Sequence, residues 1–167
     1  MTTVSEAIKK RHSARAFLDK DVDIDIVKNI IEIAKQSPSG VNTQPWNIYV
    51  LSGDARNKLV DEATSRYDQG KMDGQEYLVY PKEMPDWYKE RRRGVGWAMY
   101  GALGIEKGDT EKMMAQGRKN YEFFGAPVGI FVTVKNCVGP NGWGHVGHFI
   151  QNICLLAIEN GLATCLQ

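Results

Sequence analysis

Residues 24–51 read IDIVKNIIEIAKQSPSGVNTQPWNIYVL, and this stretch changes its pattern twice. Apolar residues recur three, seven and ten positions after Ile24, which is the spacing of one helix face, and Asp23 stands where a helix cap is expected. Pro38 then ends the helical pattern. Residues 47–51 are rich in β-branched and aromatic side chains, which predicts a strand. The stretch therefore predicts a helix and a strand joined by a polar loop.

The same two patterns alternate along the rest of the chain. Helices are expected over residues 3–11, 54–67, 97–103 (buried), 110–121 and 146–160. Residues 128–134 form a nearly unbroken apolar run, which is typical of a strand buried on both faces. A loop is expected at residues 139–142, and a further strand begins at residue 163. This order predicts an α/β (α+β) layer fold, with helices around a central sheet, in a single domain over residues 1–167.

The composition is that of a soluble globular protein with no excess of either charge. Of 167 residues, 43% are hydrophobic and 25% are charged, and 21 Lys and Arg stand against 20 Asp and Glu. This balance argues against a nucleic-acid binder, which is normally basic. No apolar run approaches the ~18 residues that span a bilayer, and the N-terminal residues lack the features of a secretory signal. We therefore expect no membrane partner and a cytoplasmic location.

Cysteine and histidine positions do not favour a metal or disulfide site. Cys137, Cys154 and Cys165 form no C-x-x-C pair, so free thiols are expected in place of a redox or metal role. His145 and His148 have the spacing of one helix face, but no carboxylate stands where an H-E-x-x-H motif would place it. The sequence therefore predicts no bound metal.

Residues 11–15 read RHSAR and are the first candidate for ligand binding. Arg11 and Arg15 could bind one phosphate through charge-assisted hydrogen bonds, with the Ser13 hydroxyl as a neutral donor. The alternative is that both arginines are solvated, or that they complement the C-terminal dipole of the preceding helix.

Residues 37–46, SPSGVNTQPW, are the second candidate, because they are polar, uncharged and stiffened by proline. Gly40 permits close approach of a ligand to the backbone, and the Asn and Gln amides both donate and accept hydrogen bonds. These properties suit the polar edge of a flat heterocycle. The alternative is a rigid turn whose amides satisfy its own backbone.

From residue 68 to residue 93 the regular patterns break, and glycine, proline and aromatic residues follow one another. Linkers are rarely so aromatic, so an inserted loop or lid is expected here. The alternative is a packed surface insertion whose arginines are simply hydrated.

The two candidate segments together resemble the paired R-x-S-x-R and S-P-S-x-x-N-x-Q-P-W motifs of the nitroreductase family of flavin-dependent oxidoreductases. FGAP at 124–127, GW at 142–143 and ENGLATC at 159–165 continue this resemblance in the same order. The resemblance implies a nitroreductase-like three-layer fold with a central mixed sheet. It also implies one FMN per subunit, bound at the interface of a homodimer.

The resemblance assigns cofactor-binding residues position by position. The residues that match the family's contacts to the FMN phosphate and ribityl chain are Arg11, His12 (through its backbone), Ser13 and Arg15. Contacts to the isoalloxazine ring, which in family members come from the partner subunit, match Pro38, Ser39, Gly40 and Asn42. The other side of the ring matches Gly142, Trp143, Gly144 and His145. Related sequences often carry an acid near position 145, so His145 departs from the family pattern.

Two further features bear on the substrate and on the end of the chain. The stretch from residue 80 to residue 93 is similar to an insertion in family members that reduce nitroaromatic compounds, so Tyr88 and Arg92 are expected to bind a flat acceptor. Family chains usually continue for some tens of residues beyond the point that Gln167 marks here. The expectation is therefore a C-terminally truncated chain, or a weaker phosphate site and dimer.

The activity that the resemblance implies is transfer of a hydride from NAD(P)H, through flavin N5, to a nitroaromatic or quinone acceptor with ping-pong kinetics. The flavin carries the redox step, so no catalytic residue is expected from the protein. Two alternatives stay open. One is a flavin reductase-like or dehalogenating relative on the same fold, and the other is a flavin-binding protein without turnover.

The expected helix over residues 146–160 is apolar almost all round and must then be buried on every side. The resemblance places it at the two-fold interface of the dimer, where a second copy would cover it. The alternative is a central helix covered by its own sheet.

Overall fold

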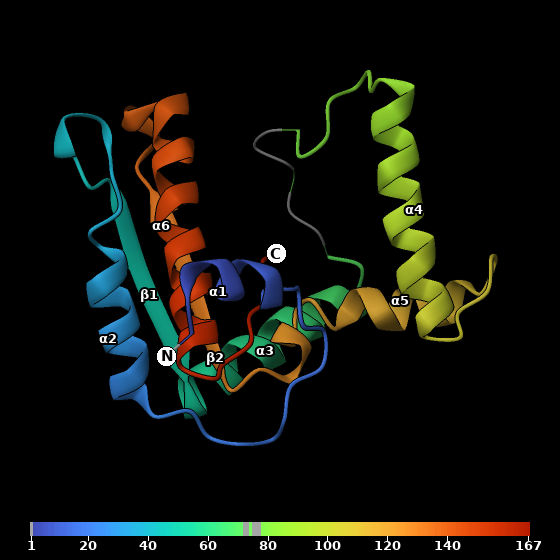
Figure 1. Cartoon of the computed structure of the whole chain (residues 1–167). Helices are drawn as coiled ribbons and strands as arrows, with labels where there is room; N and C mark the ends of the chain where they lie inside the picture. Colours follow the sequence, from blue (N-terminus) through green and yellow to red (C-terminus); the bar gives the residue numbers. More distant parts are fainter. Residues whose placement is uncertain (1, 72–73, 75–77) are drawn as a thin grey trace. The chain divides into compact units, whose positions relative to one another are not determined.

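The computed structural model describes residues 2–71, 74 and 78–167. Its longer elements in chain order are α1 (Val4–Lys10), α2 (Ile24–Ala34), β1 (Trp46–Ser52), α3 (Gly53–Asp68), α4 (Asp86–Ala102), α5 (Thr110–Arg118), β2 (Val128–Val134) and α6 (Pro140–Glu159). The chain divides into two compact units (Figure 1). The first unit contains residues up to Val60 together with Phe123–Gln167, and the second contains Asp61–Glu122.

The first unit is built on an antiparallel pair of strands. β1 and β2 run in register from Trp46 opposite Val134 to Ser52 opposite Val128, so both expected strands are confirmed. The prediction of a strand that begins at residue 163 is wrong, because in the described part of the chain the pairing there is limited to one residue. The described residues contain only a parallel bridge between Ser13 and Thr164, because a single backbone bond, from Ala14 N to Thr164 O at 3.0 Å, joins the two segments.

One face of this small sheet is covered by helices. α2 packs on α6, and α6 packs on β2, so both helices share the covered face (Figure 1). The side chains that form the core are Ile30, Ala34, Trp46, Phe149, Ile153 and Ala157. The indole of Trp46 stacks on the Phe149 ring with 4.8 Å between centroids and an interplanar angle of 8°. This stack joins β1 directly to α6 at the centre of the first unit.

The expected burial of both faces of β2 is wrong for this chain. From Ile130 to Val134, half-buried positions alternate with exposed ones, and Phe131 is 42% exposed. Its cross-strand partner Tyr49 is 57% exposed on the same face. From Ile130 onward the strand is therefore covered on one side only, by the helices α2 and α6.

Helix α6 begins earlier than the sequence predicts. The expected loop at residues 139–142 is wrong, since Pro140 is the first residue of the helix and Gly139 precedes it at φ +71°. Proline is tolerated there because the first turn of a helix has no backbone acceptor for its N–H. The helix ends as predicted, with Gly161 in the left-handed region at φ +72°.

The other helices of the first unit agree with their local signals. Thr3 and Glu6 form a reciprocal capping box at the start of α1, and Asp23 accepts a hydrogen bond from the Asp25 N–H at the start of α2. α3 follows β1 directly and ends within the second unit.

In the second unit, α4 corrects two expectations. The irregular segment expected over residues 68–93 is in fact helical from Asp86, because Pro85 precedes the first turn and Asp86 pairs with Lys89 within it. Residues 72, 73 and 75–77 of that segment lie outside the described residues. The expected burial of the helix is also wrong, since α4 has no buried residue and Trp97 is 45% exposed.

α5 is joined to the end of α3. Asp109 caps α5 by accepting from the Lys112 N–H, as the sequence predicts, and the helix ends at Arg118, three residues short of the predicted Tyr121. Arg118 bonds both carboxylate oxygens of Asp68, at 2.8 and 3.0 Å. The Tyr67 hydroxyl donates to the Met114 carbonyl at 3.0 Å. These contacts join α5 to the end of α3 within the second unit.

Within the described part of the chain, no helix has the length and apolar character needed to cross a bilayer. The cysteines are free thiols, as the sequence predicts.

Candidate functional site

The polar loop that follows α2 is fixed to α6 by a buried serine. The Ser37 hydroxyl donates to the Ala34 carbonyl at 2.6 Å and accepts from Asn152 Nδ2 at 2.7 Å. Because Ser37 is buried and fully bonded, it ends α2 and places the next residues beside the middle of α6. Asn152 was not among the expected site residues, since its partner lies 115 positions away in the sequence.

The loop itself is strained at its tip. The short 3-10 turn η1 (Gly40–Asn42) and the residue that follows Thr43 hold three non-glycine residues at positive φ: Val41 at +45°, Asn42 at +55° and Gln44 at +43°. Each such residue costs on the order of 1 kcal/mol or more. The Gln44 N–H donates to Ser39 Oγ at 2.9 Å, and its amide donates to Asn42 Oδ1 at 3.1 Å. From the sequence, a rigid turn with internal hydrogen bonds is the alternative to a ligand-binding loop. These two bonds show that part of the loop is such a turn.

Two histidines of α6 complete the attachment of the loop. The Gly40 N–H donates to His145 Nε2 at 3.2 Å, and a Cβ at position 40 would lie 3.2 Å from the same atom. His148 Nδ1 lies 3.5 Å from the Pro38 carbonyl oxygen, at the limit of a hydrogen bond. Because the two histidines lie on one face of α6, both of them contact the loop. His145 gains a role that the sequence did not supply.

The first two turns of α6 contain Gly142, Trp143 and Gly144, at the same end of the helix as His145. Gly142 has a packing reason, because an added Cβ would lie 2.9 Å from the Val138 side chain and 3.1 Å from that of Val134. Gly144 meets no such neighbour, and the Trp143 indole is largely exposed. The contacts of Gly40 with His145 and of Pro38 with His148 therefore bring the loop to the N-terminal half of α6 within one chain, whereas the resemblance implies that the loop reaches the flavin ring from the partner subunit.

Residues 11–15 follow α1 and pair with the segment that comes after α6. The Arg11 N–H caps α1 by donating to Ala7, and Ala14 pairs with Thr164. Burial raises the pKa of the nearby Cys165 thiol, and the positive charge of Arg15 opposes that rise. The hydrogen bonds given above attach the loop to α6 from its second turn onward, whereas residues 11–15 pair just beyond its last turn. Within one chain, the polar loop therefore lies near the start of α6, and residues 11–15 lie near its end (Figure 1).

The RHSAR segment has unused donors. Within residues 2–71, 74 and 78–167, neither Arg11 nor Arg15 has a carboxylate at ion-pair distance. The backbone N–H groups of His12 and Ser13 likewise donate to no acceptor in this described part of the chain. The His12 ring turns back to the Lys10 carbonyl, with its Nδ1 at 3.0 Å from that oxygen. Two guanidinium groups and two backbone donors therefore form a set that suits an anion.

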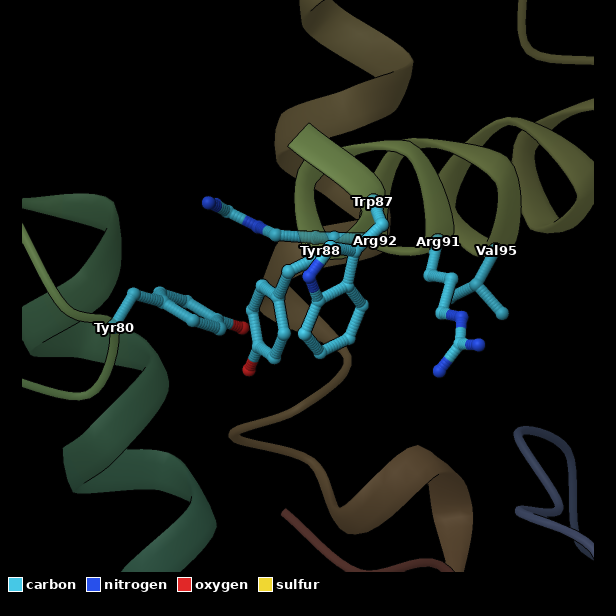
Figure 2. A pocket seen from close by; sticks show the side chains of 6 residues that line it. All are labelled: Tyr80, Trp87, Tyr88, Arg91, Arg92 and Val95. Atoms are coloured by element: carbon cyan, nitrogen blue, oxygen red, sulfur yellow. The ribbon is translucent and has the colours of Figure 1, made fainter. Parts of the chain in front are cut away.

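The second unit contains a separate pocket, shown in Figure 2, with a volume of about 300 Å³. Tyr88 and Arg92, the two residues expected to bind an acceptor, both line it. The sequence-based expectation omitted its other lining residues, which are Tyr80, Trp87, Arg91 and Val95. Residues 88, 91, 92 and 95 have the spacing of one helix face, but this signal is usable only once the helix is known to begin at Asp86.

The comparisons with known proteins define first the fold class and then the family. A crystal structure of an FMN and NADPH-dependent nitroreductase NfnB from Sphigopyxis sp. strain HMH superimposes with a TM-score of 0.92 at 39% identity, over 98% of this chain and 74% of that one. NfnB from Mycobacterium smegmatis, solved in complex with NADPH, gives a TM-score of 0.90 at 27% identity, over 96% of this chain and 72% of that one. The chain therefore has the nitroreductase-like α/β fold that the sequence predicts.

Sequence relatives agree with this fold. A 4-nitrobenzoate reductase of Nocardioides sp. (strain LMS-CY) is 38% identical over 96% of this chain and 66% of its own length. A nitrobenzene nitroreductase of Ectopseudomonas oleovorans is 34% identical over 98% of this chain and 73% of its own. Residues 8–167 match the sequence model of the Nitroreductase family. The chain belongs to the nitroreductase family, and it spans about two thirds to three quarters of the length of these relatives.

Proposed function

We propose that this chain belongs to an FMN-dependent oxidoreductase that uses NAD(P)H to reduce nitroaromatic or quinone-type acceptors. The observation that carries the proposal is the family match over residues 8–167, which includes both candidate ligand segments. Solved relatives described as FMN-dependent share the fold closely, with TM-scores of 0.92 and 0.90.

The donors of residues 11–15 fit the phosphate end of FMN. Arg11 and Arg15 carry positive charge with no carboxylate partner among the described residues, and the N–H groups of His12 and Ser13 point to no protein acceptor there. A phosphate would receive charge-assisted bonds from the guanidinium groups and neutral bonds from the backbone. We assign Arg11, His12, Ser13 and Arg15 to this role.

The loop tip and the start of α6 fit the ring of FMN. Strained backbone held in one conformation is common where a protein must meet a ligand closely, and this loop has three such residues before β1. We assign Pro38, Ser39, Gly40 and Asn42, together with Gly142, Trp143, Gly144 and His145, to the isoalloxazine. When bound, FMN would supply the two-electron redox chemistry, and these protein groups would orient its ring. The first reduction of a nitro group would consume NAD(P)H and a proton and release water and a nitroso product.

A second copy of the chain is proposed to complete the site. α6 keeps Ile150, Leu155 and Leu156 only half-buried in one chain, although the helix is apolar nearly all round. A self-complementary contact across a two-fold axis would cover them. It would also let the loop of one copy meet the RHSAR segment of the other. We therefore propose a homodimer in which FMN binding and dimerisation are linked.

Anaerobic absorption spectroscopy of the purified protein with FMN tests the activity. The expected result is a yellow protein that NADH or NADPH bleaches and that a nitroarene or quinone then restores to yellow. A bound flavin that neither dinucleotide reduces would instead indicate a flavin-binding protein without turnover. Failure to bind FMN, in a protein whose circular dichroism shows it folded, would overturn the proposal.

Arg11→Ala tests the phosphate assignment. Loss of one charge-assisted bond should weaken FMN binding by roughly 1.5–3 kcal/mol, about one to two decades in affinity. Riboflavin has no phosphate and should bind the variant and the wild type almost equally. Titrations of both flavins give the comparison, and equal losses for FMN and riboflavin would contradict the assignment.

A further inference from the structure

We propose that the pocket on α4 binds a planar aromatic group that carries an anionic substituent. The proposal deepens the proposed function, because such a group would belong either to an aromatic acid acceptor or to the 2′-phosphoadenosine end of NADPH. It assigns the pocket to charged aromatic ligands in preference to neutral nitroarenes. The pocket lies wholly within the second unit, so its residues can be described without reference to the flavin site.

Three aromatic side chains supply flat apolar surface. Tyr80 comes from the loop before α4, and Trp87 and Tyr88 come from its first turn, with their rings gathered around one space in Figure 2. The Trp87 and Tyr88 rings meet edge to face, with 5.7 Å between centroids and an interplanar angle of 76°. Two rings at this angle form a corner in which one face can stack on a flat ligand while the other contacts its edge.

Two arginines supply the charge. The Arg92 guanidinium carbon lies 4.1 Å from the centre of the Tyr80 ring, and that of Arg91 lies 5.1 Å from the centre of the Trp87 ring. Stacking on a ring occupies the face of a guanidinium group and leaves its N–H edge free to donate. No carboxylate among the described residues lies at ion-pair distance from either arginine. The two guanidinium groups are thus held in place without being neutralised.

This combination discriminates by charge. A neutral arene would gain stacking alone, whereas an aromatic anion would also accept hydrogen bonds from the guanidinium edges. The volume of about 300 Å³ is at the lower end for small-molecule sites and suits one ring system better than a whole dinucleotide. Because the lining side chains are exposed, water and salt will screen the charge, so the expected preference is moderate.

Isothermal titration calorimetry on the full chain without NAD(P)H, at low ionic strength, tests the proposal. One pair of probes is 4-nitrobenzoate and its neutral counterpart 4-nitrobenzamide, and the other pair is adenosine 2′-phosphate and adenosine. We expect the anion of at least one pair to bind about five- to ten-fold more tightly than its neutral partner. The pair with the larger ratio identifies the source of the anion. Raising the salt concentration should reduce that ratio.

Variants separate the pocket from general surface charge. Arg91→Gln combined with Arg92→Gln should bring the ratio below about two-fold by removing both charges. Arg93→Gln removes a neighbouring charge that does not line the pocket and should leave the ratio unchanged. Melting temperatures close to that of the wild type would show that all variants fold.

The possible outcomes distinguish this proposal from the proposed function. Equal affinities within both probe pairs, or a ratio that survives in the double variant, would overturn the pocket assignment whether or not FMN binds. A charge preference that depends on Arg91 and Arg92 in a chain that fails to bind FMN would support the pocket and overturn the flavin proposal.

Discussion

Replacing His145 by alanine should loosen the loop that carries Ser39, Gly40 and Asn42. The Gly40 N–H donates to His145 Nε2 at 3.2 Å, and this bond joins the loop tip to α6. A neutral hydrogen bond contributes about 0.5–1.5 kcal/mol, and the donor left behind is exposed enough to be hydrated. The closed conformation of the loop should therefore lose roughly 2- to 12-fold in population relative to open ones.

Amide hydrogen exchange at Gly40 measures this change directly. We expect exchange at this position to accelerate by the same factor in His145→Ala, while amides of β1 stay protected. His145→Gln should restore most of the protection, because the side-chain oxygen of glutamine can take the place of Nε2 as the acceptor. His148→Ala is the matched control, since the contact of its ring with the Pro38 carbonyl is already long at 3.5 Å.

Three results would refute this reasoning. Unchanged exchange at Gly40 in His145→Ala would mean that the bond does not hold the loop. A glutamine variant as loose as the alanine variant would mean that packing of the ring matters and its acceptor atom does not. Equal effects of His145→Ala and His148→Ala on exchange at Gly40 would mean that the two histidines hold the loop only by side-chain packing. If the flavin proposal is correct, FMN affinity should fall together with Gly40 protection.

Further predictions concern the core, the dimer and the acid range. Phe149→Ala removes a fully buried ring and should lower the free energy of unfolding by about 3–5 kcal/mol in urea titrations; a loss below 1 kcal/mol would mean that the site collapses around the gap. Ile150→Glu should abolish the proposed dimer and its FMN binding together, and sedimentation that shows an intact dimer would place the interface elsewhere. Arg118 holds the pKa of the Asp68 carboxyl below its usual value, so this pair stabilises the fold above the ordinary aspartate range and its contribution is lost as pH falls through the lowered pKa. Asp68→Asn should remove that part of the acid dependence, which thermal melts between neutral and acid pH would detect.

The elements that the sequence predicted well are those whose signals are local. The Thr3–Glu6 capping box and the glycine at position 161 act within one helical turn, and both lie where the sequence placed them. The paired motifs at 11–15 and 37–46 were recognisable for a similar reason, since each is a short run of specific residues. Residues within a few positions of each other determine such features, whatever the rest of the chain does.

The errors lie where a local pattern was ambiguous. Aromatic residues and arginines after Pro85 suggested irregular chain, yet those residues form the first turns of α4, because no proline follows Pro85 before the helix ends. The apolar run of β2 suggested burial on both faces, although periodicity alone cannot say how many layers cover a strand. The Gly-Pro-x-Gly run at 139–142 suggested a loop, but proline is equally at home in the first turn of a helix.

The sequence by itself determined the order of most helices and strands, the two candidate ligand segments and the family. Only the tertiary structure decided which distant groups meet: Ser37 with Asn152, and Gly40 with His145, 105 positions further along the chain. It also placed the rings and guanidinium groups of α4 and Tyr80 around one pocket. The physical reason is that a hydrogen bond or ring contact between remote residues depends on how whole elements pack, and the few residues around each partner do not encode that packing.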